Sequence, residues 1–343
     1  MNIVFRNDSS FKIGTGHTRR SLSLAVHLKS LGANCKFVCR NDFGNINDLV
    51  RSCNIPLIEF NGNRIEDEIN AVRSAFDEEN LDWIIIDSYL IDIETETALR
   101  PHVSKILVID DFSDRDHDCD LFLNPSIGTE KLTRSLLPAG CQILLGSKYA
   151  MVSEKFIQQS KLPRVQKEKV ENVMVFFTSG DDDGETLKAL EGLKDLGFKI
   201  TVVLNDECKT NRTVSNMCTA KNWTIYNYVE NMSDLIGSVD LVVGSGGSSN
   251  FERCLLGVPA IVSALSEDQI NIAEQLSEIG AVIYLGPSKT VATKDYENAV
   301  VSLTSKKLKE MSIAGQQLID GLGVERVSQC IMIVNQDLTK TSK

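Results

Sequence analysis

The segment that most restricts how this chain can fold is residues 241–259, where an apolar run leads into a glycine-rich turn and a helical pattern. Residues 241–243 read Leu-Val-Val, a β-branched run typical of a buried parallel strand. Residues 244–253 read Gly-Ser-Gly-Gly-Ser-Ser-Asn-Phe-Glu-Arg, and apolar side chains continue at helical spacing until Gly257 and Pro259 end the helix. This order of strand, glycine-rich turn and helix is typical of α/β proteins.

The same turn is a candidate anion site. Glycines let a backbone approach a ligand closely, Ser248 or Ser249 can cap the helix, and free N–H groups at a helix start attract negative charge. Glu252 lies a short step inside the helix, where its carboxylate can reach a sugar hydroxyl. The turn is not a P-loop, because no lysine follows the glycines, and it is not a full dinucleotide fingerprint. A plain turn that binds no ligand is the alternative.

Strand and helix patterns alternate along the chain in two series, which predicts two α/β domains whose parallel sheets are covered on both faces. The 343 residues suffice for two domains of ordinary size. We expect two doubly wound Rossmann-like domains facing each other across a cleft, with ligands at the carboxyl ends of the strands. The predicted strands cover residues 3–6, 35–39, 56–60, 83–86, 106–109, 121–123 and 142–145, and then 173–177, 199–204, 223–226, 241–243, 260–263 and 282–285.

The expected domain boundaries follow from composition. An N-terminal domain covers residues 1–160, and a charged linker that contains Pro163 covers residues 161–172. A C-terminal domain covers residues 173–323. A last helix and a polar tail cover residues 324–343, with the helix over about residues 324–335 and the frayed tail over residues 336–343.

Composition also excludes several classes of function. The net charge of −11 argues against a nucleic-acid partner, and no apolar run approaches the roughly 20 residues of a membrane span. The N-terminus begins directly with a strand and lacks a signal-peptide pattern, and nine scattered cysteines without a Cys-x-x-Cys pair suit reduced thiols. We expect a cytoplasmic monomer with a small-molecule substrate, no membrane partner, no metal and no cofactor.

His17 is the most informative single residue, because it stands between a Gly-x-Gly turn and the start of a helix. A helix N-terminus disfavours the imidazolium form, so His17 can accept a proton. A histidine that only caps or packs against the loop is an equally weighted alternative. Other residues fall on the same rim of the first predicted sheet: Asp8, Gly14, Gly16, Arg40, Asp87, Tyr89, Asp110 and Asp111.

Four further groups of residues have more than one explanation each. Asp87, Asp92, Asp110 and Asp111 stand at or beyond strand ends, where carboxylates orient a histidine, bind sugar hydroxyls or serve as N-caps. The three aspartates at 181–183 suit a helix dipole better than a Mg²⁺ ion. For His117, within an Asp-Arg-Asp-His-Asp run, a solvated charge run is favoured over a chemical role. Gln269 follows a strand, where its amide can bind sugar hydroxyls or a phosphate.

Several strings of residues are familiar when taken together. They are Phe5-Arg6-x-Asp8-x-Ser10, Ile13-Gly14-Thr15-Gly16-His17 with Arg20, Phe37-Val38-Cys39-Arg40, Asp87-x-Tyr89-x-x-Asp92, Ile109-Asp110-Asp111 with Arg115-x-His117-Asp118, Gly146-x-x-Tyr149-Ala150, Gly246-Gly247-Ser248-Ser249-x-x-Glu252-Arg253-Cys254-x-x-Gly257-x-Pro259 and Asp320-Gly321-x-Gly323-x-x-Arg326. In this order they resemble the PseG-like nucleotide-sugar hydrolases of pseudaminic acid biosynthesis, over nearly the whole chain.

The resemblance implies a GT-B fold similar to that of MurG-type glycosyltransferases. It implies hydrolysis of UDP-2,4-diacetamido-2,4,6-trideoxy-β-L-altropyranose to UDP and free sugar, with inversion at the anomeric carbon. It implies that His17 activates water, and that UDP places its phosphates at Ser248 and Ser249, its ribose at Glu252 and its uracil near Val229. The other expected UDP-binding residues are Gly246 and Gly247, and the expected substrate-binding residues are Arg6, Asp8, Gly14, Gly16, Arg20, Tyr89, Asp92 and Gln269.

The chain departs from the family pattern at a few positions. The pattern has Gly-Gly where this chain has Thr178-Ser179, an arginine where Ser153 stands and a tryptophan where Thr95 stands. Two of the departures lie near predicted substrate loops, so the identity of the sugar stays open. A glycosyltransferase of the same fold and a non-catalytic nucleotide-sugar binding protein are the alternative functions.

Overall fold

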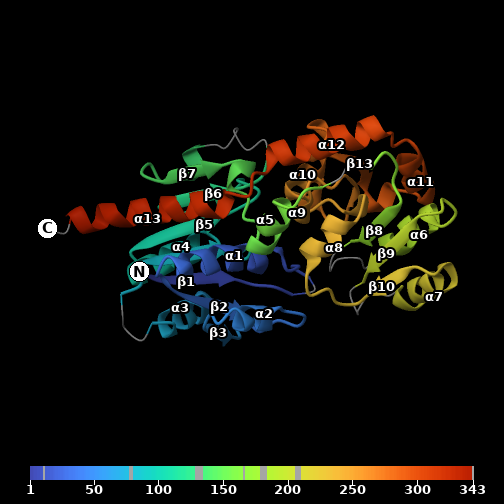
Figure 1. Cartoon of the computed structure of the whole chain (residues 1–343). Coiled ribbons are helices and arrows are strands. Elements are labelled where there is room, and N and C mark those ends of the chain that lie inside the picture. Colours follow the sequence, from blue (N-terminus) through green and yellow to red (C-terminus); the bar gives the residue numbers. More distant parts are fainter. Residues whose placement is uncertain are drawn as a thin grey trace. The chain divides into compact units, whose positions relative to one another are not determined.

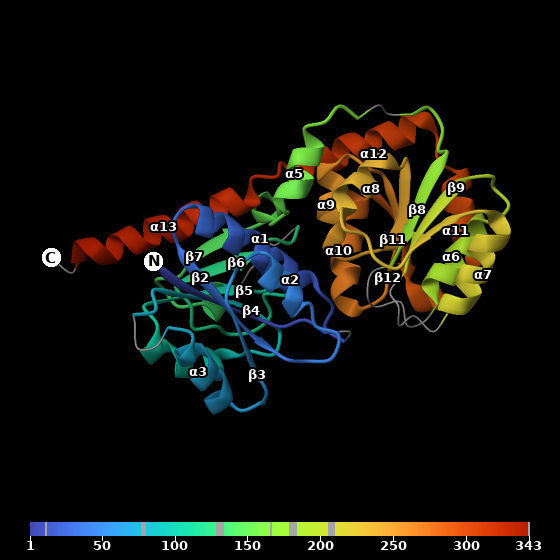
Figure 2. The same ribbon diagram turned by 60° about the horizontal axis from the view of Figure 1, so that its bottom comes forward.

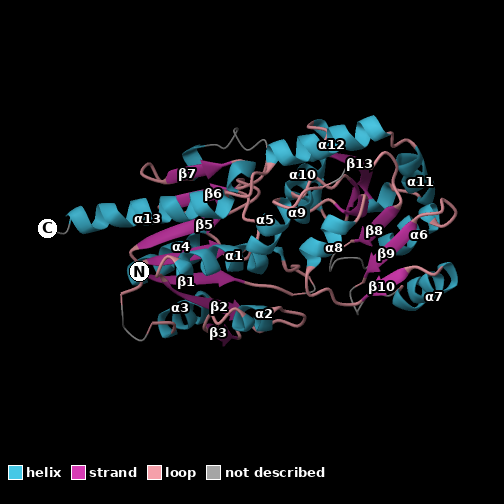
Figure 3. Ribbon diagram, viewed as in Figure 1, coloured by secondary structure: helices cyan, strands magenta, loops and turns pink. Residues whose placement is uncertain are grey.

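The structure, a computed structural model, describes residues 1–10, 12–76, 80–127, 134–164, 167–177, 184–204 and 210–341, with the backbone alone for Asp268 and residues 335–341. The chain divides into two compact units (Figure 1). Unit 1 comprises Met1–Ser153 and Gly321–Lys343, and unit 2 comprises Glu154–Asp320. Both units consist of strands alternating with helices, which confirms the predicted α/β class (Figure 3).

Unit 1 contains a seven-stranded parallel sheet in the order β3-β2-β1-β4-β5-β6-β7. Its strands are β1 (Asn2–Asn7), β2 (Asn34–Arg40), β3 (Leu57–Phe60), β4 (Trp83–Asp87), β5 (Lys105–Ile109), β6 (Leu121–Asn124) and β7 (Gln142–Leu145). The strand order reverses between β1 and β4, which are neighbours in the sheet with Asn7 opposite Asp87. Ligands of open parallel sheets bind at the carboxyl ends of the strands at such a reversal.

Helices cover both faces of this sheet because successive strand residues point to opposite sides. The helices are α1 (Gly16–Ser30), α2 (Asn47–Ser52), α3 (Ile65–Ser74), α4 (Ile93–Leu99) and α13 (Gly323–Thr341). Ile3 and Phe5 pack with α1, α2 and α13, whereas Val4 packs with α3 and α4. In Figure 2, α3 accordingly lies on the side of the sheet away from α1.

Unit 2 contains a six-stranded parallel sheet in the order β10-β9-β8-β11-β12-β13, which reverses between β8 and β11. Its strands are β8 (Asn172–Phe176), β9 (Lys199–Val203), β10 (Thr224–Tyr226), β11 (Leu241–Ser245), β12 (Ala260–Ala264) and β13 (Val282–Pro287). Its helices are α5 (Glu154–Ser160), α6 (Glu185–Leu193), α7 (Asn211–Lys221), α8 (Met232–Ser238), α9 (Ser249–Leu255), α10 (Glu267–Glu278), α11 (Thr293–Val301) and α12 (Ser305–Leu318). Every predicted strand range overlaps an observed strand.

The structure corrects the predicted boundaries at both ends of unit 2. Helix α5, expected in the N-terminal domain, packs against α8 and α9 of unit 2 and buries Phe156 there. The final helix belongs to the core of unit 1, because Val324, Val327 and Ile331 form a stripe at helical spacing that packs against α1. Helix α13 also continues to Thr341, where a frayed tail was expected from residue 336.

We expect Ile331→Ala to destabilise unit 1 by about 2–5 kcal/mol, the usual cost of removing a buried isoleucine side chain. Ile331 is fully buried, whereas Ile333 on the same helix is 59% exposed. The two tryptophans lie in different units, Trp83 in unit 1 and Trp223 in unit 2, so Trp223→Phe leaves a fluorescence signal from unit 1 alone. Urea unfolding of this single-tryptophan protein measures the effect.

Ile333→Ala is the matched control and should change the free energy of unfolding by no more than about 0.5 kcal/mol, as exposed positions usually do. An unfolding midpoint of Trp83 that Ile331→Ala leaves unchanged would show that α13 does not stabilise unit 1.

Candidate functional site

The candidate site of unit 1 lies at the carboxyl ends of β1 and β4, where the strand order reverses. Asp87 ends β4 and its carboxylate is fully buried. Three side chains of α1 converge on it: His17, Arg20 and Ser21, which share one helix face because they are three and four residues apart. Thr18 ties the same helix to β1 by donating its hydroxyl to Asn7 Oδ1 at 2.8 Å.

The imidazole of His17 forms a short hydrogen bond with Asp87. The distance from Nδ1 to Oδ1 is 2.6 Å, and the His17 side chain is only 9% exposed. An ionised carboxylate accepts hydrogen bonds only, so Nδ1 is the donor and the lone pair of the neutral ring lies on Nε2. Within the described ranges no hydrogen bond occupies Nε2.

Arg20 keeps Asp87 ionised and extends the site to the next strand end. Its guanidinium donates two hydrogen bonds to Asp87, at 2.6 and 2.8 Å, and two to Asp111, at 2.8 and 2.9 Å. Burial alone would raise the pKa of Asp87, but the charge of Arg20 and the hydrogen bonds from Arg20 and His17 outweigh it and hold that pKa well below its usual range. Arg20 thereby links the ends of β4 and β5.

Tyr89 completes the rim of this site. Its hydroxyl donates to Asp111 at 2.8 Å, and its ring meets the ring of His17 edge to face with centroids 4.6 Å apart. Burial and the adjacent Asp111 carboxylate raise the pKa of Tyr89, so its phenol stays protonated and acts as a donor. The arrangement as a whole is a histidine held in one tautomer by a buried carboxylate, which is the requirement for a general base.

Arg6 and Asp8, both expected substrate-binding residues, belong to a buried ion-pair network. The guanidinium of Arg6 binds Glu68 at 2.5 Å and Asp8 at 2.7 Å, and Arg40 binds the same Glu68 at 2.8 Å. Arg6 is 0% exposed and Asp8 is 2% exposed. In this conformation the two residues hold β1 to β2 and α3, and their contact with a substrate stays a prediction.

Gly14, Gly16 and Asp92 shape the backbone near the rim. Gly14 has a φ of +83°, favourable for glycine alone, and closes a turn by donating its N–H to the carbonyl of Ser10 at 2.8 Å. Gly16 is the first residue of α1. Asp92 is the N-cap of α4 and accepts hydrogen bonds from the N–H and hydroxyl of Thr95, both at 3.1 Å. The structure therefore gives Asp92 the capping role, and its contact with a sugar stays a prediction.

For His117 the expectation of a solvated charge run is wrong. His117 is 3% exposed, its Nδ1 lies 2.8 Å from Glu96 and its Nε2 lies 3.2 Å from Asp110. Burial on its own lowers the pKa of His117, but the hydrogen bonds to Asp110 and Glu96 outweigh it and raise the pKa to about 9. His117 is thus a buried cation that fixes the β5 end, next to Asp111, onto α4.

In unit 2 the glycine-rich turn joins β11 to α9 where the strand order reverses. Gly244 has no room for a Cβ atom, which would overlap the carbonyl oxygen of Phe176 on β8, and a Cβ on Gly246 would lie 2.9 Å from that of Ala273. These two glycines therefore serve internal packing, and the contact of Gly246 with a nucleotide stays a prediction. A Cβ atom on Gly247 would lie 3.6 Å from the side chain of Gln269, an ordinary contact distance.

The serines of the turn do not cap α9 through their side chains, contrary to the sequence-based prediction. Ser248 stands at the N-cap without a side-chain capping hydrogen bond and is exposed. The N–H groups of Asn250 and Phe251 donate to Gly247 and Ser248 in tight turns. Helix α9 is also short, with seven residues.

Two other predicted nucleotide contacts lie on the same edge of the sheet. Glu252 is in the first turn of α9, as expected, and Val229 is half-buried in the loop between β10 and α8. Gln269 accepts the N–H of Leu265 through Oε1 and lies beside Gly247. The aspartates at 181–183 lie outside the described residues, as does Thr178-Ser179.

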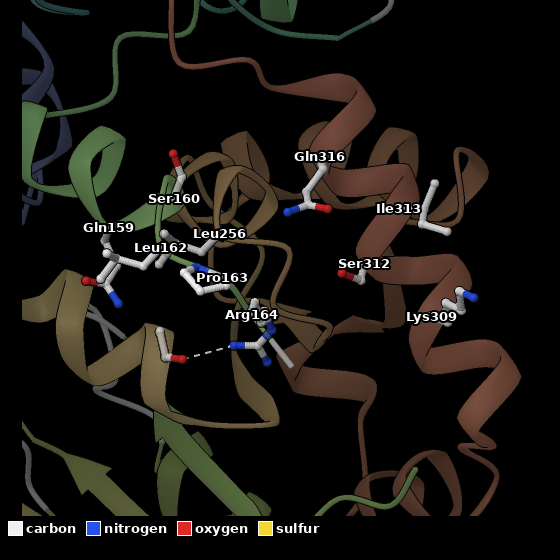
Figure 4. A pocket seen from close by; sticks show the side chains of 11 residues that line it. Gln159, Ser160, Leu162, Pro163, Arg164, Leu256, Lys309, Ser312, Ile313 and Gln316 are labelled. Carbon is white, nitrogen blue, oxygen red and sulfur yellow. Dashed lines mark hydrogen bonds between the residues drawn. The ribbon is translucent and has the colours of Figure 1, made fainter. Parts of the chain in front are cut away.

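A pocket of about 280 Å³ in unit 2 lies elsewhere (Figure 4). Leu256 after α9 and Gly237 before β11 line it, so it lies at the opposite end of α9 from the glycine-rich turn. Arg164 in its wall donates to the carbonyl groups of Gly237 and Val239, at 3.0 and 2.7 Å. The predicted nucleotide-binding residues do not line this pocket.

Sequence reasoning missed four buried side chains that organise the two sites: Glu68, Glu96, Asn250 and Arg253. Residues three or four apart on a helix lie on the same face. This spacing on α1, and from Ser249 and Asn250 to Arg253 on α9, could have identified the residues that contact each other within each helix. Glu68 and Glu96 carry no such signal, because their partners lie on other strands and loops.

Comparison with known proteins identifies similar sequences and a similar fold. Residues 184–322 match the glycosyltransferase family 28 C-terminal domain. The chain is 26% identical over 303 residues to an uncharacterized protein of Methanocaldococcus jannaschii, covering 84% of this chain and 61% of that protein. It is 31% identical over 169 residues to the UDP-2,4-diacetamido-2,4,6-trideoxy-β-L-altropyranose hydrolase of Campylobacter jejuni, covering 49% of this chain and 57% of the hydrolase. This chain spans less than two thirds of the length of either relative.

The fold is similar to that of solved glycosyltransferases. The MurG structure of Acinetobacter baumannii superposes with a TM-score of 0.67 at 16% identity, covering 97% of this chain and 99% of MurG. The GT-B-like fold class and the resemblance to the PseG-like hydrolases are therefore both confirmed. Among the described helices, none combines the length and apolar character that a membrane crossing requires.

We expect His117→Gln to lower the free energy of unfolding of unit 1 by about 3–5 kcal/mol near neutral pH, because it leaves the buried Glu96 without its cation and Asp110 with Arg115 alone, 3.8 Å away. The folded-state pKa of His117 is raised from 6.5 to about 9. Its stabilisation is therefore complete below about pH 6.5 and is lost as the pH rises through about 9. Urea unfolding followed by Trp83 fluorescence, from about pH 6 to about pH 10, measures the difference between the two proteins.

The difference in the free energy of unfolding between the parent and His117→Gln should become smaller as the pH rises. The control is His102→Gln in the same unit, where the histidine is exposed and no pH-dependent change is expected. A difference between His117→Gln and the parent that stays constant across this range would contradict a buried charge on His117.

Proposed function

We propose that this chain hydrolyses a UDP-linked 2,4-diacetamido-2,4,6-trideoxy sugar to the free sugar and UDP, in nonulosonate biosynthesis of the pseudaminic acid type. The observation that carries the proposal is the His17–Asp87 pair, a base held in one tautomer at the strand-order reversal of unit 1. The similarity of half the chain to a hydrolase of this sugar nucleotide supports it.

In the proposed reaction, Nε2 of His17 takes a proton from water as the water oxygen bonds to the anomeric carbon. The bond from that carbon to the phosphate oxygen breaks, and its electron pair leaves with UDP. Attack opposite the leaving group inverts the anomeric centre. Asp87 stabilises the imidazolium that forms, and Arg20 keeps Asp87 ionised throughout.

Unit 2 supplies the nucleotide site in this proposal. Ser248 and Ser249, with Gly246 and Gly247, face the phosphates of UDP, Glu252 takes the ribose and Val229 lies near the uracil. Breaking the sugar–phosphate bond puts negative charge on the diphosphate, which preorganised donors stabilise. The exposed hydroxyl of Ser248 and the amide of Gln269 beside Gly247 support this assignment.

The sugar side is assigned to unit 1 around His17. Tyr89 and Arg20 line the rim next to the histidine and are the proposed sugar contacts with the most direct geometric support. Five more residues are proposed to shape or line the same region: Gly14, Gly16, Asp92, Arg6 and Asp8.

A glycosyltransferase that passes the sugar to an acceptor is the second candidate. The match of residues 184–322 to a glycosyltransferase domain favours it. The same histidine can deprotonate an acceptor hydroxyl as well as water, so the geometry of unit 1 is compatible with both reactions.

The first experiment separates hydrolysis from transfer. Incubating the protein with the UDP-linked diacetamido sugar alone should release UDP and the free sugar in equal amounts, with the anomeric configuration inverted in the initial product. Nucleotide release is followed by a coupled assay and the anomer by NMR. Release of UDP only when an acceptor is added would favour the glycosyltransferase.

The second experiment tests the role of His17. We expect His17→Ala to lower turnover at least about 100-fold, the scale of a lost general base, while UDP affinity stays nearly unchanged. His27→Ala, at the other end of the same helix and away from Asp87, is the matched control and should keep its activity. Turnover that survives in His17→Ala would rule out the histidine as the base.

A further inference from the structure

Arg253 is a buried cation that forms no ion pair with a described carboxylate. It lies in α9 directly behind the glycine-rich turn, and it is 1% exposed. Among the described residues, no carboxylate oxygen lies within the 4.0 Å of an ion pair with its guanidinium, and its Nε has no hydrogen-bond partner. Burial lowers the pKa of Arg253 to about 10 although the neighbouring Glu252 carboxylate raises it, and the guanidinium remains charged at neutral pH.

Two arginines of unit 1, the buried Arg6 and the largely buried Arg20, are arranged differently. Arg6 binds Glu68 and Asp8, and Arg20 binds Asp87 and Asp111. These carboxylates outweigh the effect of burial and raise the pKa of both arginines. Since an unpaired buried charge is costly, Arg253 stands out as a cation whose counter-charge is missing from the described part of the protein.

The hydrogen bonds of Arg253 all run to the turn. Nη1 donates to Asn250 Oδ1 at 2.8 Å and reaches the carbonyl of Ser245 at 3.5 Å, and Nη2 donates to Ser249 Oγ at 3.1 Å. The amide of Asn250 in turn donates to the carbonyls of Ser245 and Gly247, at 3.0 and 2.8 Å. The guanidinium therefore fixes the shape of the turn through Asn250.

The contact with Ser249 also determines what that hydroxyl can do. Because Ser249 Oγ accepts a hydrogen bond from a charged donor, its own proton is left to donate to another acceptor, and the charge makes it a stronger donor. Gly244 leaves the space for this arrangement, since a Cβ atom there would lie 3.2 Å from Nη2 of Arg253. The positive charge of Arg253 thus lies behind the turn, and the polarised hydroxyl of Ser249 lies within it.

We propose that Arg253 is the buried counter-charge for a nucleoside diphosphate bound at residues 245–249, acting through Ser249 and Asn250 without touching the ligand. The inference rests on the proposed function, which puts UDP at this turn. It makes Arg253 a positioning residue that selects for phosphate charge: the affinity for UDP depends on it, and the affinity for the uncharged nucleoside does not.

The test is calorimetric titration of uridine, UMP and UDP into the full chain and into Arg253→Met, which removes the charge and keeps much of the side-chain volume. The parent should bind UDP more tightly than UMP and uridine. Arg253→Met should lose about 10–100-fold in UDP affinity, the scale of a lost charge-assisted interaction, with uridine affinity unchanged. Arg253→Lys should recover part of the loss, because it restores the charge without the fork of donors.

Two further variants serve as controls. Arg212→Met changes the net charge by the same amount at an exposed position of α7 and should leave UDP affinity unchanged. Ser249→Ala keeps the guanidinium and removes the hydroxyl, so it should weaken UDP binding in the same direction by a smaller factor.

Each outcome has a distinct meaning. A parent protein with no preference for UDP over uridine overturns the proposed nucleotide site and this inference with it. A parent with that preference, which Arg253→Met fully retains, overturns the role of Arg253 and leaves the proposed function standing. Equal losses of uridine and UDP affinity in Arg253→Met overturn the counter-charge and show a structural role alone.

Discussion

The buried carboxylate of Asp87 is the constraint on which the site of unit 1 depends. A carboxylate without exposure keeps its charge only if cations and donors surround it, and three side chains on one face of α1 do so. The same contacts fix the angle at which α1 leaves the sheet, the tautomer of His17 and, through Arg20, the position of Asp111. The contacts that orient His17 are thus the same ones that hold the strand ends together where the strand order reverses.

The two units share a topology and differ in how they treat buried charge. In unit 1 Arg6, Arg20 and His117 each contact two carboxylates. In unit 2 Arg253 forms no ion pair with a described carboxylate, and the neighbouring Glu252 offsets only part of the effect of burial on its pKa. Paired charges hold the base of unit 1 in one orientation, whereas a buried cation without an ion pair suits a unit that receives an anion.

The fold could be predicted largely from local patterns, and the sites only in part. Runs such as residues 241–243 and 83–86 identify strands because a parallel strand buried on both faces must be apolar throughout. His17 and Arg20 could be singled out by their place at a strand end. The acids that pair with Arg6 and His117 could not, because Glu68 and Glu96 look like ordinary exposed helix residues until the helices are packed. The role of α13 was missed for the same reason: its apolar stripe does not say which unit it covers.

That last helix gives the chain an unusual order of assembly. Unit 1 leaves off at Ser153 and is resumed at Gly321, so unit 2 is an insertion within it. When a ribosome makes this protein, the apolar face of α1 that Val327 and Ile331 will cover must wait until all of unit 2 has been synthesised. Domains fold as units while they emerge, so unit 2 is free to fold first although it comes later in the chain. The first unit stays incomplete until α13 has been made, and a chain that ended before α13 would leave that apolar face uncovered.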